Sequence, residues 1–201
     1  RGLTALMLNK QRNGSKEMRE LLVSSGSNVA DLSLNESLFK AVNAGNAPET
    51  LKLLKAGASP NSVGPNQQTL LMIACEKHYV EIVKLLISNK ADVNATDAIG
   101  WTALHYAVQN RPNNAIVQIL LDNGIGIDRR SINELRNYRD NIGMKWTALM
   151  LAVESGNTTT VQLLLDGGAD ANIQVDGDSA VNIASRHNHK EILRLLIKSG
   201  A

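Results

Sequence analysis

A short motif recurs at a nearly constant interval along this chain of 201 residues, and this repetition constrains the fold more than any other feature. Each copy pairs a Thr-led or related apolar segment with a Leu-rich segment that follows it. The positions equivalent to the leading Thr are 4, 36, 69, 102, 147 and 179, so the successive spacings are 32, 33, 33, 45 and 32. A period of this size indicates stacked supersecondary units and not one globular interior.

Each unit is predicted to hold two short helices. In the third unit, apolar residues recur at helical spacing within 70–74 and again within 80–87. Thr69 is expected to cap the first helix. A left-handed residue is expected to end the second helix in several units, at Gly57, Gly124, Gly168 and Gly200. One such unit cannot bury its own apolar faces, so the six units are expected to stack in register.

Two stretches resemble the motifs of the ankyrin repeat family. Gly100-Trp101-Thr102-Ala103-Leu104-His105 is similar to Gly-x-Thr-Pro-Leu-His, and Leu86 to Asn94 is similar to Leu-Leu-x-x-Gly-Ala-Asp-x-Asn, with Lys90 in place of glycine. The resemblance covers essentially the whole chain. It implies an all-α solenoid of stacked helix-turn-helix units with projecting hairpin fingers. The expected single domain, 1–201, has repeats at about 1–30, 31–63, 64–96, 97–128, 141–173 and 174–201.

The second repeat departs from this pattern, because Glu36-Ser37-Leu38-Phe39 stands where the family has its Thr-led motif. Two short helices are still expected there, the first starting at Glu36. The chain is also expected to be a piece of a longer protein.

The resemblance implies a function in binding partner proteins, through the fingertips and a concave face of inner helices. Transferring those positions to this sequence gives the candidate contacts Asn43, Asn66, Gln68, Glu76, Ile99, Trp101, Gln109, Trp146, Glu154, Asp176, Asp178 and Arg186. Both tryptophans occupy the same repeat position. They are interpreted either as direct contacts, since tryptophan is enriched at hot spots, or as packing between adjacent hairpins.

An insertion at 129–145 accounts for the one long spacing. Ser131 to Glu134 resembles a capping box, and Ile132, Leu135 and Tyr138 would share one face of a short helix. One interpretation is an enlarged basic finger that binds an acidic partner segment, and the other is a tolerated surface insertion. Its candidate contact residues are Arg129, Arg130, Arg136, Tyr138, Arg139 and Lys145.

Composition excludes several functional classes. A net charge of +2 is too small to indicate nucleic-acid binding or an anionic membrane surface, and no apolar stretch is long enough to span a membrane. A single cysteine, Cys75, excludes an intramolecular disulfide framework and points to a reducing compartment, so a cytoplasmic or nuclear location is expected. Cys75 takes a small-residue core position and is expected to be buried packing. A monomer is expected as well.

The sequence contains no phosphate-binding glycine loop and no nucleophile elbow. His187 and His189 are two residues apart and are expected to point to different sides of a helix, which argues against a metal site. We therefore expect neither catalysis, nor a cofactor, nor a bound metal.

Three alternatives remain open. Asn94 resembles the ankyrin asparagines that an asparaginyl hydroxylase modifies, although a turn-stabilising role would also explain it. The run from Arg129-Arg130 to Thr147-Ala148-Leu149-Met150 loosely resembles ankyrin domains that bind a short oligoadenylate, which would make the chain a small-ligand or oligonucleotide sensor. The chain would also fit the targeting module of a larger enzyme.

Overall fold

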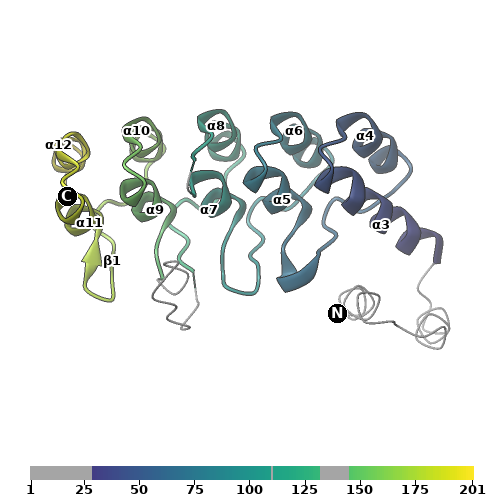
Figure 1. Cartoon of the computed structure of the whole chain (residues 1–201), viewed down its shortest axis with the longest axis horizontal. Helices are drawn as coiled ribbons and strands as arrows, with labels where there is room; N and C mark the ends of the chain where they lie inside the picture. The colour runs from purple at the N-terminus through teal and green to yellow at the C-terminus, as the bar shows by residue number, and fades with distance from the viewer. Residues whose placement is uncertain (1–28, 110, 132–144) are drawn as a thin grey trace. The chain divides into compact units, whose positions relative to one another are not determined.

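A computed structural model describes residues 29–109, 111–131 and 145–201, with side chains from residue 32 onward. In this part of the chain the helices form five consecutive pairs (Figure 1). The chain divides into two compact units, Arg1–Asp92 and Val93–Ala201, which we call the N-terminal and C-terminal units. The predicted first repeat, at about 1–30, lies almost entirely outside the described residues.

The N-terminal unit contains two described helix pairs in two layers. The inner helices pack on each other, each outer helix packs on its inner partner, and the outer helices also touch. The pairs are α3 (Val29–Asn43) with α4 (Ala47–Lys55), and α5 (Leu70–Glu76) with α6 (Val80–Ser88), and a short 3₁₀ turn, η1 (Pro65–Gln67), lies between them. The interior between the layers is aliphatic and includes Leu38, Val42, Leu53, Leu70, Leu71, Ile82 and Leu86.

The C-terminal unit repeats the same arrangement three times. Its inner layer is α7 (Ala103–Val108), α9 (Ala148–Glu154) and α11 (Ala180–Arg186), and its outer layer is α8 (Asn114–Asp122), α10 (Thr158–Asp166) and α12 (Lys190–Lys198). Neighbouring helices touch within each layer and between layers. The all-α class and the helix-turn-helix units predicted from the repeats are thereby confirmed.

Side-chain caps set the start of most inner helices. Thr69 Oγ1 accepts a hydrogen bond from the Met72 amide at 3.3 Å, and Thr147 Oγ1 accepts one from the Met150 amide at 3.3 Å. Each cap satisfies one of the amides that a helix leaves free in its first turn. The predicted role of Thr69 is therefore confirmed.

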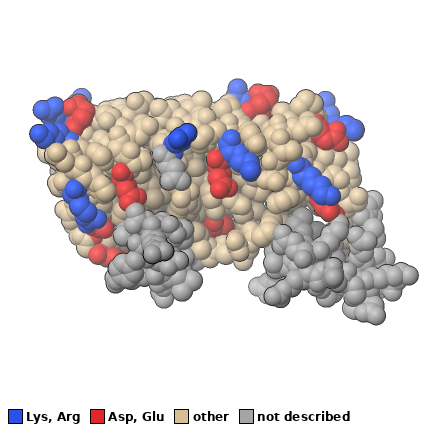
Figure 2. Space-filling model, viewed as in Figure 1, with Lys and Arg blue, Asp and Glu red and all other residues tan. Residues whose placement is uncertain are grey.

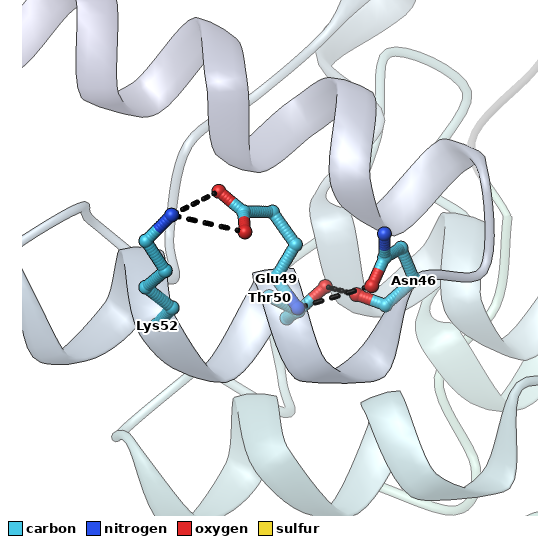
Figure 3. A network of polar contacts seen from close by, with 4 residues as sticks. All are labelled: Asn46, Glu49, Thr50 and Lys52. Carbon is cyan, nitrogen blue, oxygen red and sulfur yellow. Dashed lines mark hydrogen bonds and ion pairs between the residues drawn. The ribbon is translucent and has the colours of Figure 1, made fainter.

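Asparagine does the same work at the start of several outer helices. Figure 3 shows α4, where Asn46 Oδ1 accepts a hydrogen bond from the Glu49 amide at 3.0 Å. The Thr50 hydroxyl donates to the Asn46 carbonyl oxygen at 2.7 Å, and Lys52 lies 3.3 Å from the Glu49 carboxylate. The cap and the acidic side chain of Glu49 in the first turn both favour the start of this nine-residue helix.

A left-handed residue follows each described outer helix. The φ angles of Gly57, Gly124, Gly168 and Gly200 are 96°, 74°, 92° and 96°, which confirms the predicted C-terminal glycines. After α6 this position is Lys90, with φ of 70°. A side chain in this conformation places Cβ too close to the following carbonyl, at a cost of about 1–2 kcal/mol.

The prediction that the second repeat begins with a short helix at Glu36 is wrong. Helix α3 begins at Val29 and runs for 15 residues, against 6 or 7 for the other inner helices. The segment from Val29 to Glu36 contains neither glycine nor proline, so nothing in it interrupts helical hydrogen bonding. An extended helix stands here where a hairpin finger was expected.

Within the described residues, paired backbone forms hairpin fingers before α5 and before α11. An isolated bridge pairs Val63 with Thr69 before α5. Before α11, the antiparallel strands β1 (Gln174–Val175) and β2 (Asp178–Ser179) pair Gln174 with Ser179 and Val175 with Asp178. Most of the insertion at 129–145 falls on 132–144, outside the described residues, so the short helical turn predicted within it stays a prediction.

Asn and Asp side chains link the loops of successive repeats within each unit. Asn94 Oδ1 accepts a hydrogen bond from the Gly126 amide at 2.6 Å, and its Nδ2 donates to the Gly124 carbonyl oxygen at 3.2 Å. The same repeat position is filled by Asn61, Asp128 and Asn172, each of which hydrogen-bonds the backbone of the next loop. We call this series of side chains the Asx ladder.

Replacing Lys90 with glycine is expected to stabilise the N-terminal unit. Glycine relieves the left-handed strain but adds backbone entropy to the unfolded chain, so the net gain should be about 0.5–1 kcal/mol. Urea unfolding followed by far-ultraviolet circular dichroism would measure it. Lys84→Gly, in the middle of α6, is the opposite control and should destabilise by about 1 kcal/mol. A loss of stability in Lys90→Gly would contradict the strain argument.

Candidate functional site

In each unit, a polar residue just before an inner helix contacts a polar residue at the end of the same helix, on the surface. Gln68 Nε2 donates to Glu76 Oε2 at 3.1 Å, and Arg186 forms an ion pair with Asp178. In both pairs the residue just before the helix reaches the residue at its end, eight positions later. The transferred positions Gln68, Glu76, Asp178 and Arg186 are therefore brought together two by two. Surface pairs of this kind contribute little to stability, which leaves these groups available for recognition.

Trp101 packs inside the C-terminal unit. Only 7% of its surface is exposed, its ring stacks on His105 with centroids 5.8 Å apart, and Tyr106 meets it edge-on at 5.3 Å. Asp97, which the sequence reasoning passed over, organises this cluster: its Oδ1 accepts from the Trp101 amide at 2.9 Å and its Oδ2 from the Tyr106 hydroxyl at 2.7 Å. The aspartate thus holds together the turn that precedes α7.

Trp146 is buried as well, with 3% of its surface exposed. The packing interpretation of the two tryptophans therefore has direct structural support. Contact between either indole and a partner stays a prediction. The sequence itself favours this packing alternative, since the tryptophans lie next to the apolar segments that open α7 and α9.

His105 is a buried neutral histidine that ties two repeats together. The Thr102 amide donates to its Nδ1 at 3.1 Å, so the ring proton sits on Nε2, which faces the Trp146 carbonyl oxygen at 3.2 Å. Burial lowers the pKa of His105 to about 4, while the Trp146 hydrogen bond and the charge of Asp97 act in the opposite direction. His105 therefore links the start of α7 to the segment that precedes α9.

The ends of α7 and α9 present half-buried polar side chains. Gln109 follows α7, and Glu154 is the last residue of α9. Partial burial raises the pKa of the Glu154 carboxyl, and the positive charges of His187 and Arg186 oppose this rise. Glu154, Arg186 and Asp178 consequently form one electrostatic neighbourhood within the C-terminal unit.

The expectation that His187 and His189 point to different sides of a helix is wrong. Neither residue lies inside a helix: His187 follows α11, His189 precedes α12, and Asn188 between them has φ of 56°. This left-handed residue turns the chain so that the two rings stack with centroids 5.6 Å apart. Across the residues that the structure describes, no group of three His, Cys, Asp or Glu side chains could hold a metal ion.

The fingertip candidates differ in exposure. Asn66 and Asp176 are exposed and left-handed, with φ of 56° and 51°, while Ile99 is half-buried and its amide donates to Asp97 Oδ1. Gln67, which sequence reasoning did not select, lies beside Asn66 with φ of 60°. Asn66 was the signal that would have identified Gln67, because a two-residue hairpin turn favours Asn at its first position.

The two ends of the insertion are described. Arg129 and Arg130 are exposed, Ser131 is buried with its amide 3.4 Å from the Trp146 carbonyl oxygen, and Lys145 is half-buried. Arg136, Tyr138 and Arg139 lie outside the described residues. The basic finger is therefore still a prediction from the sequence.

On the face drawn in Figure 2, the acidic and basic side chains of the described residues are dispersed over a largely uncharged surface. Over the described ranges, none of the helices is both long and apolar enough to cross a membrane. Cys75 is completely buried, and burial raises the pKa of its thiol, which confirms a packing role.

Acidification is expected to destabilise the C-terminal unit through His105. The unfolded histidine takes up a proton near its ordinary pKa of 6.5, whereas the folded one does so near 4. The contribution of neutral His105 to the free energy of unfolding is fully present above pH 6.5. It is lost progressively as the pH falls towards 4, by about 3 kcal/mol in all.

Urea unfolding followed by tryptophan fluorescence between pH 7 and 4 would test this, because Trp101 and Trp146 both report on the C-terminal unit. His105→Asn should be less stable at pH 7 and should lose this part of the pH dependence. The exposed His187→Asn should keep it. Equal pH profiles for the wild type and His105→Asn would rule out His105 as the source.

Asn94→Ala is expected to cost about 1–3 kcal/mol in the same assay, because it leaves the Gly126 amide and the Gly124 carbonyl without their partner. Asn172→Ala removes one longer, exposed hydrogen bond of 3.3 Å and should cost less. An equal or larger effect at Asn172 would contradict this ranking of the Asx ladder.

The comparisons with known proteins agree with the fold. The family model described as "Ankyrin repeats (3 copies)" matches residues 38–131 and 130–201. B-cell lymphoma 3 protein homolog of Mus musculus is 34% identical over 160 residues, and B-cell lymphoma 3 protein of Homo sapiens is 36% identical over 160 residues. Each of these matches covers 77% of this chain and 33% of the relative.

A third relative, E3 ubiquitin-protein ligase KEG of Arabidopsis thaliana, is 38% identical over 112 residues, which cover 55% of this chain and 6% of that protein. The chain thus spans a third or less of the length of these three relatives. The family match agrees with the helix pairs, the Thr caps and the left-handed loop residues of the structure. The chain belongs to the ankyrin repeat family.

Proposed function

We propose that this chain is an adaptor domain that recruits protein partners through its fingertips and the polar ends of its inner helices. The observation that carries the proposal is the pair of exposed polar contacts, Gln68 with Glu76 and Asp178 with Arg186, held at equivalent places in the two units. Ankyrin repeats generally mediate protein–protein interactions, and the four side chains of these contacts are fully or partly exposed.

The rigidity of the framework supports this proposal. All side chains from Leu70 to Cys75 in α5 and from Ala148 to Val153 in α9 are buried, so these helices have little freedom to rearrange. A preorganised surface loses little conformational entropy when it binds, which preserves affinity. The proposed contacts are the fully or partly exposed candidates Asn43, Asn66, Gln68, Glu76, Ile99, Gln109, Glu154, Asp176, Asp178 and Arg186. We assign Trp101 and Trp146 to packing beneath them.

The basic finger is proposed to bind an acidic segment of the partner. Arg129 and Arg130 are exposed where the insertion begins, and the sequence adds Arg136, Arg139 and Lys145 against Glu134 and Asp140. Clustered charge of one sign mainly speeds association and selects partners of the opposite sign. Tyr138 is proposed as an aromatic contact in the same finger.

We propose that the domain acts as a monomer in the cytoplasm or nucleus and performs no catalysis itself. The completely buried free thiol of Cys75 is compatible with a reducing compartment. The ligase among the relatives illustrates that an ankyrin segment of this kind can form part of a larger enzyme, so a targeting role within such a chain is included in the proposal. Asn94 is retained as a proposed modification site.

Reversing charge in the finger is expected to weaken partner binding by about tenfold. The immobilised wild-type chain would first capture partners from a lysate for identification by mass spectrometry, and the purified partner would then be titrated. Arg136→Glu/Arg139→Glu is the test variant. Lys84→Glu/Lys198→Glu changes the net charge equally on exposed positions of outer helices and is the matched control.

Loss of affinity in the finger variant alone, with a smaller loss at high salt, would support the acidic-segment contact. Equal weakening of partner binding in both variants would show that the finger acts only through the net charge of the chain. Tight binding of a short oligoadenylate by the wild type, with no protein captured, would instead favour the ligand-sensing alternative.

A further inference from the structure

The finger before α5 ends in a tight turn that its sequence fits poorly. The Gln68 amide donates to the Pro65 carbonyl oxygen at 3.2 Å, and the Gly64 amide donates to the Gln68 carbonyl oxygen at 2.8 Å. Between them, Asn66 and Gln67 are both left-handed, with φ of 56° and 60°. A two-residue hairpin turn of this type favours Asn followed by Gly. Asn tolerates the first position, but glutamine at the second is strained.

The finger before α11 shows the unstrained solution of the same problem. Its turn residues are Asp176, with φ of 51°, and Gly177, with φ of 87°, between the paired residues Val175 and Asp178. A Cβ atom at Gly177 would meet nothing within 4 Å, so glycine is needed there for its backbone conformation alone. The same chain therefore uses glycine in one fingertip and glutamine in the other.

The side chain of Gln67 does not offset this strain by bonding within the described part of the chain. Gln67 is exposed, and its carboxamide forms no hydrogen bond with another described residue. The adjacent Gln68 is different, because its carboxamide is held by Glu76 at 3.1 Å. A strained residue that makes no internal contact is more readily explained by an external one.

The surroundings of Gln67 indicate the chemistry of that contact. The finger from Val63 to Thr69 contains no charged residue, so it has no side chain that could form an ion pair with a phosphate or a charged side chain. A carboxamide presents two N–H donors and one carbonyl acceptor, the same groups that an extended peptide backbone presents in return. Asn66 places a second exposed carboxamide next to the first.

We propose that the Gln67 carboxamide hydrogen-bonds the main chain of an extended segment of the partner, and that this contact is the reason for a glutamine at a strained fingertip. The inference rests on the proposed function, because it assumes a protein partner. It adds one contact residue and the chemical group that the residue recognises. The expected contribution is that of a single hydrogen bond, or about fivefold in affinity.

The probe for this proposal is a displayed library of random 12-residue peptides, selected on the wild-type chain and then synthesised for titration. Gln67→Ala keeps the restricted backbone and removes the carboxamide, so it should bind the selected peptides about fivefold more weakly at unchanged stability. Gln67→Gly should lose the same affinity while raising the urea midpoint of unfolding.

Lys90→Gly is the matched control, since it relieves the same kind of strain in the same unit, in the loop that follows α6 and not in the fingertip turn. It should raise the urea midpoint and leave peptide affinity unchanged. Gln67→Asn keeps a carboxamide and should restore part of the affinity lost in Gln67→Ala.

Peptides that bind the wild type and Gln67→Ala equally would overturn this inference and leave the adaptor function standing. Selection of no peptide at all would count against the adaptor function and remove the basis of the inference with it. A fall in the urea midpoint of Gln67→Gly would show that glutamine is there for stability, which would also overturn the proposal.

Discussion

Burial of aliphatic side chains between neighbouring helix pairs is the interaction on which the rest of this structure depends. The inner helices after α3 have only 6 or 7 residues, too few to be stable alone in water. Each fully buried Leu, Ile or Val contributes about 1.5–3 kcal/mol, and neighbouring helices supply the partners for them. Because α5 and α9 are buried along most of their length, the candidate contacts on the inner layer lie at helix ends and in the fingers. The same packing that forms the repeats therefore limits where the inner layer can contact a partner.

The polar network complements this packing. The Asx ladder satisfies backbone groups in loops that would otherwise depend on water, and it links each loop to the next repeat within its unit. His105 does the same for the inner layer, joining Thr102 at the start of α7 to the Trp146 carbonyl before α9. Polar bonds between repeats are directional, whereas aliphatic contacts are not. We infer that these bonds set the register of helices that apolar packing alone would leave free to slide.

Most of the framework could be predicted from the sequence because its signals are local. Thr69 as a helix cap and the glycines after the outer helices follow from rules that act within a few residues. The start of α3 could not be predicted from the repeat phase, because the absence of any breaker before Glu36 outweighs the family pattern. The stacked His187 and His189 and the Trp101 cluster depend on turn geometry and on Asp97, which period and spacing do not encode. For the candidate contacts, the sequence identified positions but not which of them are paired.

The distribution of glycine shows how neighbouring repeats decide the cost of a left-handed residue. Between the inner and outer helices, Gly45 and Gly156 have φ of 72° and 69°, and a Cβ atom at either would lie 2.8 Å from a ring atom, of Tyr79 and His189 respectively. Backbone and packing both require glycine at these two positions. Asn188 occupies the corresponding place after α11 with the same backbone sign and no glycine. Glycine is thus required at the left-handed positions where a neighbouring ring occupies the space that a Cβ atom would need. At other left-handed positions only the free-energy cost of the backbone conformation remains. That cost is small enough for a residue with a side chain to stand in place of glycine.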